Sequence, residues 1–247
     1  MSHVRAGAAF LLVFLFGPVQ AQEAVRVAVA SNFLDTAAVL GTTFQHDTGT
    51  EVRLSAGSTG KLYAQIINGA PFDVFLAADI ERPALLEQSG HAVAGSGRIY
   101  ARGRLVVWSA SAKDCLAALH EDASGKVAIA NPVTAPYGRA AREFLQDIGA
   151  WERVAQRIVY GQNAVQALQF AATGNAAVAI VARSQVSSPA LPPAACRYEV
   201  PEAQHAPIAQ QAVLINAESD AARRFLDFLE SDEARHIIER SGYEVGR

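Results

Sequence analysis

Four short turns in this chain carry the residues best suited to bind a small anion. Each turn follows a short apolar segment and leads into a helical pattern, and the four are centred on Ser31-Asn32, Ser58, Tyr137 and Ala164. Helix N-termini leave backbone N–H groups without partners and carry a partial positive charge, so several that converge can hold an anion without lysine or arginine. The pattern predicts capture of a small oxyanion rather than a reaction on it.

The run AGSTGK around Ser58 is close to two catalytic motifs and matches neither of them. A nucleophile elbow, G-x-S-x-G, needs glycine where this chain has Ala56, and a phosphate-binding loop needs glycine where it has Ser55. The six histidines also lack a spacing typical of a metal site or a catalytic triad. We therefore expect no enzyme, no cofactor and no bare metal ion, although a periplasmic enzyme stays as an alternative from another functional class.

Serine and asparagine at the start of a helix are most often caps, so Ser31, Asn32 and Ser58 have a purely structural alternative. Capping and anion binding are compatible, because a side chain at a helix start points to the same region as the free N–H groups. Tyr137 has its own alternative as a core or interface residue. We favour the anion-binding interpretation for all four residues, with the backbone of Ala164 as a fifth contributor.

Charged residues near the turns are not expected to touch the anion. Asp73 and Asp79 in the run FDVFLAAD are predicted to be structural, because a carboxylate that faced a dianion would repel it. Lys61 is interpreted as a surface residue, and neither it nor Arg139 is predicted as a ligand. The four turns themselves contain no Asp or Glu, which disfavours protonated anions such as hydrogen phosphate, since these need an acceptor.

Residues 1–21 are predicted to be a secretory signal peptide. The segment has a short basic region, an apolar stretch AGAAFLLVFLFG, and a small-x-small end at Val19-Gln20-Ala21. A membrane anchor is the alternative, but the apolar stretch is shorter than the roughly 20 residues needed to span a bilayer. No cysteine follows the stretch to accept a lipid. We expect a periplasmic protein.

The rest of the chain is mildly acidic, so it offers no basic field for nucleic acid or a membrane surface. Two cysteines, Cys115 and Cys196, are present. In an oxidising compartment an even count predicts one disulfide, which could stabilise the fold by roughly 4 kcal/mol in the loop-entropy model. Two separate buried thiols are the alternative. We expect a monomer.

Apolar strands alternate with amphipathic helical stretches throughout, which is typical of an α/β protein with a parallel sheet covered by helices. No flexible linker divides the chain into sequential halves. We therefore predict a discontinuous arrangement, with lobe 1 formed by residues 24–103 and 212–247 and lobe 2 by residues 104–211, joined by two extended crossings. The late helices, capped by Ser219 and Ser231, are expected to pack on lobe 1.

Five segments in order resemble the periplasmic molybdate-binding proteins of ABC transporters, the ModA family, over nearly the whole mature chain. They are VAVASNF, SAGSTGKLYAQI with GAPFDVFLAAD, ANPVTAPYGRAA, GQNAVQAL and FLESDEARHIIERSGY. The resemblance implies a type II periplasmic binding-protein fold, with two α/β lobes and the ligand in the cleft between them. It also implies a membrane permease with a cytoplasmic ATPase as partner.

The same resemblance implies a set of ligand residues. Ser31 and Ser58 stand where the family has hydroxyl ligands, and Ala164 stands where it uses a backbone N–H. Asn32 and Tyr137 match the branch of the family with ASN and APYG motifs. The other branch has a late tyrosine where this chain has Ala182, so the phenol is assigned to Tyr137.

The implied ligand is molybdate, with tungstate expected to bind as well. Molybdate is a fully deprotonated dianion that only accepts hydrogen bonds, so hydroxyl and N–H donors suit it. Sulfate is also a tetrahedral dianion, and only the size of the cavity separates it from the larger ions. A sulfate or thiosulfate receptor on the same fold therefore stays open as an alternative.

Overall fold

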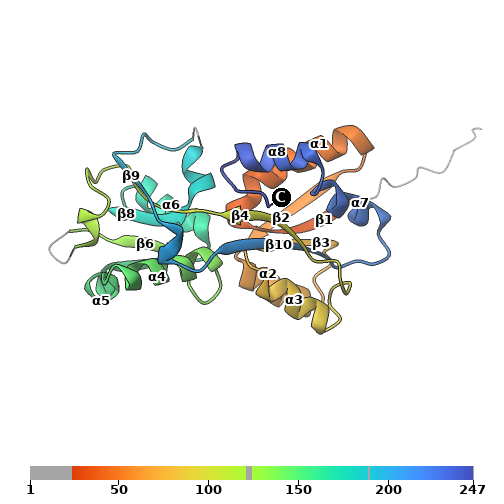
Figure 1. The fold of residues 1–247 in the computed structure, drawn as a ribbon, viewed down its shortest axis with the longest axis horizontal. Helices are drawn as coiled ribbons and strands as arrows, with labels where there is room; N and C mark the ends of the chain where they lie inside the picture. Colours follow the sequence, from red (N-terminus) through yellow and green to blue (C-terminus); the bar gives the residue numbers. More distant parts are fainter. Residues whose placement is uncertain (1–23, 121–123, 189, 247) are drawn as a thin grey trace, which may run out of the picture.

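The computed structural model describes residues 24–120, 124–188 and 190–246, and the predicted signal peptide lies outside them. The chain forms two α/β lobes side by side (Figure 1), each built on one five-stranded sheet. This confirms the predicted fold class. Among the described residues no helix combines the length and the apolar character that a membrane crossing requires.

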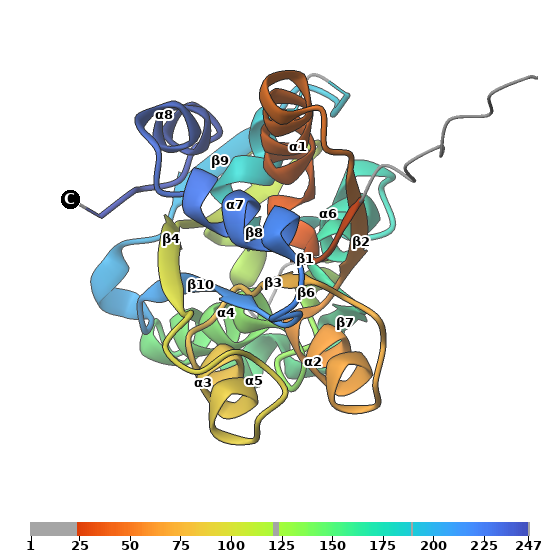
Figure 2. The ribbon, with the colours of Figure 1, turned by 90° about the vertical axis from the view of Figure 1, so that its right-hand side faces the viewer.

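The first lobe contains the sheet β2-β1-β3-β10-β4. Its strands are β1 (Val25–Ala30), β2 (Val52–Gly57), β3 (Val74–Leu76), β4 (Arg98–Gly103) and β10 (Ile208–Leu214). Its helices are the 3-10 turn η1 (Ser31–Phe33), α1 (Leu34–Thr48), α2 (Thr59–Ile67), α3 (Glu81–Gln88), α7 (Asp220–Phe228) and α8 (Asp232–Arg240). Figure 2 shows α2 and α3 on one side of this sheet and α1, α7 and α8 on the other.

The second lobe contains the sheet β7-β6-β8-β5-β9. Its strands are β5 (Leu105–Ser109), β6 (Val127–Ala130), β7 (Ile158–Gly161), β8 (Val178–Ala182) and β9 (Cys196–Glu199). Its helices are α4 (Pro136–Asp147), α5 (Trp151–Val154) and α6 (Ala164–Ala172), with 3-10 turns η2 (Ala117–Leu119), η3 (Ala155–Arg157) and η4 (Arg183–Ser187). A further 3-10 turn, η5 (Glu202–Gln204), lies between β9 and β10.

The two sheets have equivalent strand orders, and both are mixed rather than wholly parallel. In each sheet the first three strands of the order are parallel, whereas β10 runs antiparallel to β3 and β5 runs antiparallel to β8. The antiparallel strand is in each case the one that has just arrived from the other lobe. The expectation of a parallel sheet is therefore wrong for the strands next to the crossings.

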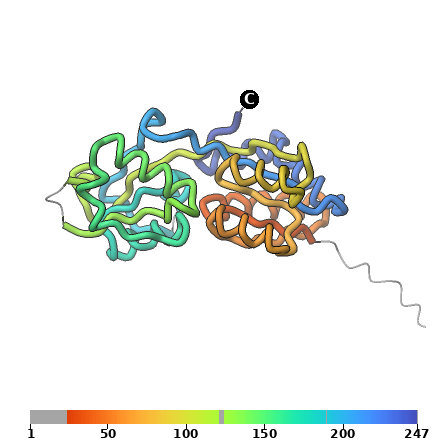
Figure 3. Tube along the Cα trace, turned by 90° about the horizontal axis from the view of Figure 1, so that it is seen from below, coloured from red at the N-terminus to blue at the C-terminus, as the bar shows by residue number. Residues whose placement is uncertain are grey.

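The chain passes between the lobes twice, and Figure 3 shows the two passages side by side. The first passage is Arg104, between β4 and β5, and the second is the segment 200–207, between β9 and β10. Strand β10 pairs with β4 from Ile208 onward. Residues 208–211, which we expected at the end of lobe 2, thus belong by their strand pairing to the sheet of lobe 1.

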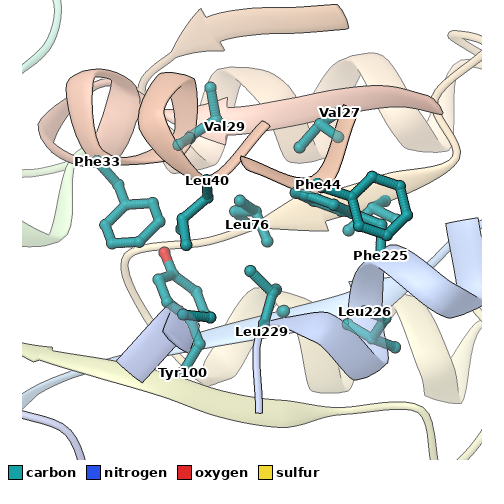
Figure 4. Packing of buried hydrophobic residues seen from close by; sticks show 14 of the residues in the cluster. Val27, Val29, Phe33, Leu40, Phe44, Leu76, Tyr100, Phe225, Leu226 and Leu229 are labelled. Carbon is teal, nitrogen blue, oxygen red and sulfur yellow. The ribbon is translucent and has the colours of Figure 1, made fainter. Parts of the chain in front are cut away.

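A single apolar cluster holds the C-terminal helices on the first lobe. Figure 4 shows Phe44 of α1 against Phe225 of α7 in this cluster, and their rings meet edge to face at 5.2 Å. The hydroxyls of Ser219 and Ser231 each accept a helix N–H at 3.1 Å, so both predicted caps are present. Gly242 adopts the left-handed conformation just after α8.

Cys115 and Cys196 form a disulfide within the second lobe, which confirms the predicted bridge. It joins the segment after β5 to the start of β9, over a sequence separation of 81 residues. The bridge lies at the end of β5 and β9 away from the crossings, because Cys196 pairs with Ser109 while Val200 bonds to Leu105.

Candidate functional site

All five predicted site residues line one small cavity between the lobes. The cavity lies at the carboxyl ends of parallel strands, namely β1 and β2 of the first lobe and β7 of the second. The N-terminus of α4 also lies next to it. The remaining lining residues are Ala30, Gly57, Thr59, Ala78, Ala135 and Pro136.

Ser58 stands at the N-cap position of α2 without acting as a cap. Its side chain makes no capping hydrogen bond, and its Oγ is buried with no hydrogen-bond partner among the described residues. A buried unpaired hydroxyl destabilises a fold by about 1–3 kcal/mol, so such groups need a reason. The geometry therefore contradicts the cap-only alternative for Ser58 and leaves its hydroxyl available to a ligand.

Ser31 begins η1 directly after β1, and only 7% of its surface is exposed. No capping bond is made by a side chain at this helix start, and Ser31 Oγ has no partner within the described part of the chain. The nearby Thr59 is different, because its hydroxyl accepts the Ala78 N–H at 3.1 Å and holds α2 against the end of β3. Ser31 and Ser58 thus bring to the cavity two hydroxyls that no capping bond uses.

Asn32 has its side chain occupied within the first lobe. Its Nδ2 donates to Gln210 Oε1 at 3.0 Å and to Tyr243 Oη at 3.1 Å, which uses both amide protons. Tyr243 in turn donates to the Asn32 carbonyl at 2.6 Å. The group of Asn32 left for an anion is therefore its backbone N–H, in the first turn of η1.

Tyr137 is the second residue of α4, after Pro136, so its backbone N–H has no partner within the helix. Its phenol oxygen accepts a hydrogen bond from Gln210 Nε2 of the first lobe at 3.3 Å. Burial, together with the phenols of Tyr243 and Tyr100, raises the pKa of Tyr137 well above its ordinary value, so the phenol stays protonated. Tyr137 therefore offers a backbone donor at the cavity and a phenol that bonds across the lobes.

Ala164 is the first residue of α6, where its backbone N–H is likewise without an intrahelical partner. The cap of this helix is Asn163, whose side chain accepts the Gln166 N–H at 3.0 Å. Because the Asn163 side chain accepts the N–H of Gln166, it leaves the backbone N–H of Ala164 free. The second lobe thus faces the cavity with two helix N-termini.

The two acidic residues close to the turns are ion-paired, as predicted for structural residues. Asp73 binds Arg26 at 2.8 Å and accepts a bond from Asn216 at 2.9 Å. Burial acts to raise the pKa of Asp73, but the bonds from Arg26 and Asn216 outweigh it and the net shift is downward. Asp79 pairs with Arg82 in the first turn of α3.

The two basic residues in question reach across the lobes instead of into the cavity. Lys61 Nζ donates to Gln162 at 2.8 Å, and Arg139 pairs with Glu81 at 3.2 Å. Arg82 also donates to the Val133 carbonyl at 3.1 Å. No cluster of metal-ligating side chains occurs among the described residues. Arg139 and Arg82 thus have carboxylate partners, whereas Lys61 is held by the neutral amide of Gln162.

Sequence reasoning missed the residues behind the cavity. Gln210 is fully buried, and its Oε1 also accepts from Tyr100 Oη at 3.1 Å. A glutamine at a buried position of the strand IAQQAVL was the available signal, because a buried amide needs partners. Tyr243 lies in a motif used for the resemblance, yet nothing local to it indicated a contact with Asn32.

The comparisons with known proteins agree with this architecture. The model of the family described as bacterial extracellular solute-binding protein matches residues 25–244. The molybdate-binding protein ModA of Rhodobacter capsulatus is 44% identical over 97% of this chain and 96% of its own length. ModA of Azotobacter vinelandii is 43% identical over 91% of this chain and 90% of that protein.

Solved structures show the same likeness. The periplasmic molybdate-binding protein of Azotobacter vinelandii superposes with a TM-score of 0.84 at 35% identity, covering 90% of this chain and 100% of that one. The sulfate-binding protein SubI of Mycobacterium tuberculosis has a TM-score of 0.73 at 14% identity, covering 90% of this chain and 87% of that one, which shows the fold alone. The fold and the site define a solute-binding protein of the type II class. The chain belongs to the bacterial extracellular solute-binding proteins and, within them, to the ModA family.

Proposed function

We propose that this protein binds molybdate in the interlobe cavity and delivers it to an ABC transporter. The observation that carries the proposal is Ser58 Oγ, buried at the cavity without a partner. Hydrogen bonds to charged groups contribute roughly 1.5–3 kcal/mol, so a dianion offsets the desolvation of this hydroxyl. The likeness to proteins named for molybdate binding supports the same ligand.

The donors proposed for the anion come from both lobes. The first lobe supplies the hydroxyls of Ser31 and Ser58 and the backbone N–H of Asn32. The second supplies the N–H groups at the starts of α4 and α6, at Tyr137 and Ala164, and the phenol O–H of Tyr137, which accepts from Gln210 and keeps its own proton to donate. A set that only donates matches an ion that only accepts. It disfavours phosphate, which carries a proton at neutral pH and needs an acceptor.

Binding is proposed to close the lobes about Arg104 and the segment 200–207. The five site residues are all at most 7% exposed in this structure, so an anion can enter only after the lobes separate. The closed form is the one proposed to meet a membrane permease with its ATPase. The place of action is proposed to be the periplasm, reached by means of residues 1–21.

Titration calorimetry of the mature protein with molybdate, tungstate, sulfate and phosphate tests the ligand. We expect tight binding of molybdate and tungstate, weak binding of sulfate, and none of phosphate. The second candidate, a sulfate or thiosulfate receptor, predicts the reverse order of molybdate and sulfate. Equal or tighter binding of sulfate would therefore overturn the proposal.

A further inference from the structure

We propose that Gly60 is a positioning residue that sets how tightly the closed protein holds its anion, through one backbone hydrogen bond across the mouth of the cleft. The bond runs from the Gly60 N–H of α2 to the Thr134 carbonyl of the second lobe, at 2.8 Å. This inference rests on the proposed function, because it needs an anion that the closing lobes enclose.

The position of this bond in the fold makes it sensitive to closure. Gly60 follows β2, the edge strand farthest from the crossings in its sheet. Thr134 follows β6, which lies next to β7, the corresponding edge strand of the second sheet. Opening about the crossings separates these far edges most. Contacts near the crossings, such as that between Gln210 and Tyr137, lie next to the hinge and move less.

The absence of a side chain at position 60 is what permits the contact. A Cβ at Gly60 would lie 3.1 Å from both the Cα and the carbonyl oxygen of Thr134, and 3.2 Å from Arg82 Nη2. Two of those three neighbours are backbone atoms of the other lobe, so they yield only if the lobes shift. Gly60 does not have a positive φ, so its own backbone conformation does not require glycine.

The same contact positions both halves of the candidate site. Gly60 lies two residues after Ser58, in the first turn of α2, and Lys61 beside it bonds to Gln162, two residues before Ala164. A shift at Gly60 therefore changes the distance between the hydroxyl of the first lobe and the α6 N-terminus of the second. In the open form, with Thr134 withdrawn, a methyl group at position 60 has no such neighbour.

The test compares Gly60→Ala with wild type in molybdate affinity, anion release rate and melting temperature without molybdate. Alanine favours a helix over glycine by about 1 kcal/mol. We therefore expect an unchanged or higher melting temperature without molybdate. The dissociation constant should rise by about tenfold, mainly through faster release, because crowding is confined to the closed form.

Gly41→Ala is the matched control. A Cβ at Gly41 also meets its nearest neighbour at 3.1 Å, but that neighbour is the Val52 side chain of the same lobe. This variant should alter stability without molybdate and leave affinity unchanged. Thr134→Ala keeps the carbonyl and removes a buried hydroxyl that has no partner among the described residues and does not line the cavity, so this variant should also bind like wild type. If Thr134→Ala weakens binding as much as Gly60→Ala, the side chain rather than the backbone bond is responsible and the proposal is wrong.

The outcomes separate this proposal from the proposed function. A wild-type protein that does not bind molybdate contradicts the function, whatever the variants do. A wild type that binds, together with a Gly60→Ala variant of equal affinity and release rate, contradicts the role of Gly60 alone. A variant with a lower melting temperature and unchanged affinity would show that Gly60 serves only the packing of its own lobe.

Discussion

In the first lobe the two turns that follow β1 and β2 present side-chain hydroxyls to the cavity, from Ser31 and Ser58. In the second lobe the turns that follow the equivalent strands, β6 and β7, present the starts of helices at Tyr137 and Ala164. The contrast is clearest at the caps of α2 and α6, since Ser58 leaves its oxygen unpaired and Asn163 uses its own. The first lobe can therefore lose a hydrogen-bond donor when a single side-chain oxygen is removed. The second lobe can lose a backbone N–H donor only if its backbone moves.

The largest expected effect is confined to the second lobe. Reducing the Cys115–Cys196 bridge should lower the free energy of unfolding by up to about 4 kcal/mol, because the bridge closes a long loop. Affinity for molybdate should be mostly kept while the protein is folded, since neither cysteine lines the cavity. Calorimetric unfolding with and without reductant measures the first effect, and titration measures the second. A lost affinity in the folded, reduced protein would contradict this.

Gly138→Ala should damage the second lobe through its backbone. A Cβ at Gly138 would lie 2.2 Å from the Ala130 carbonyl oxygen, so α4 must move away from the end of β6. We expect the stability to fall by roughly 3 kcal/mol and the affinity to fall with it, because the N–H of Tyr137 moves too.

Gly57→Ala is the counterpart in the first lobe. There the three nearest neighbours of the new Cβ are all in the Leu62 side chain, the first at 3.1 Å, and this side chain can adjust. Gly57→Ala should lower the free energy of unfolding clearly less than Gly138→Ala does, as measured by chemical unfolding. Equal losses would mean that the backbone of the second lobe is not the more constrained of the two.

Ser58→Ala and Asn163→Ala should have opposite effects. Ser58→Ala removes a donor to a dianion, so affinity should fall by about ten- to a hundredfold, while the melting temperature without molybdate should stay the same or rise because a buried unpaired hydroxyl is removed. Asn163→Ala removes a helix cap, so stability should fall by about 1 kcal/mol and affinity should change little. Ser31→Ala should behave like Ser58→Ala.

The control for the hydroxyl variants is Ser55→Ala, at an exposed position of β2. It should leave both affinity and melting temperature unchanged. Ser58→Ala and Ser31→Ala with intact affinity would refute the assignment of hydroxyl donors to the first lobe.

The smallest expected effect concerns pH and the first lobe. Because the pKa of Asp73 is lowered in the folded state, its contribution to stability is complete above the ordinary carboxyl pKa near 4 and is lost as pH falls through the lowered value. Asp73→Asn should therefore be less stable than wild type at pH 7, and the difference should shrink below about pH 4. Melting temperatures across this range test the claim, and a difference that stays constant with pH would contradict it.

Local signals in the sequence predicted much of the fold. The strand-turn-helix pattern, the caps at Ser219 and Ser231 and the disulfide needed only residue types and their order. The antiparallel direction of β10 and β5 was missed, because strand direction depends on where the chain re-enters a sheet and not on its apolar pattern. The lobe boundary expected at residue 211 differs from the strand pairing, which begins at Ile208, because the partner strand β4 is distant in sequence.

The candidate site shows the same limit. The five residues brought together at the cavity stood at turns with recognisable chemistry, so they could be predicted. The occupied side chain of Asn32 and the phenol of Tyr137 turned toward Gln210 could not, because those bonds join residues 178 and 73 positions apart. Hydrogen bonds over such separations leave no local pattern in a single sequence.

The bond between Tyr243 and Asn32 also has a consequence for how each molecule matures. The two residues are 211 positions apart, so the first turn is synthesised long before its partner. A chain that is still growing, or one that stops before Tyr243, leaves the Asn32 carbonyl and amide without this phenol. The hydrogen bonds that surround Asn32 are therefore complete only after Tyr243 has been added to the chain.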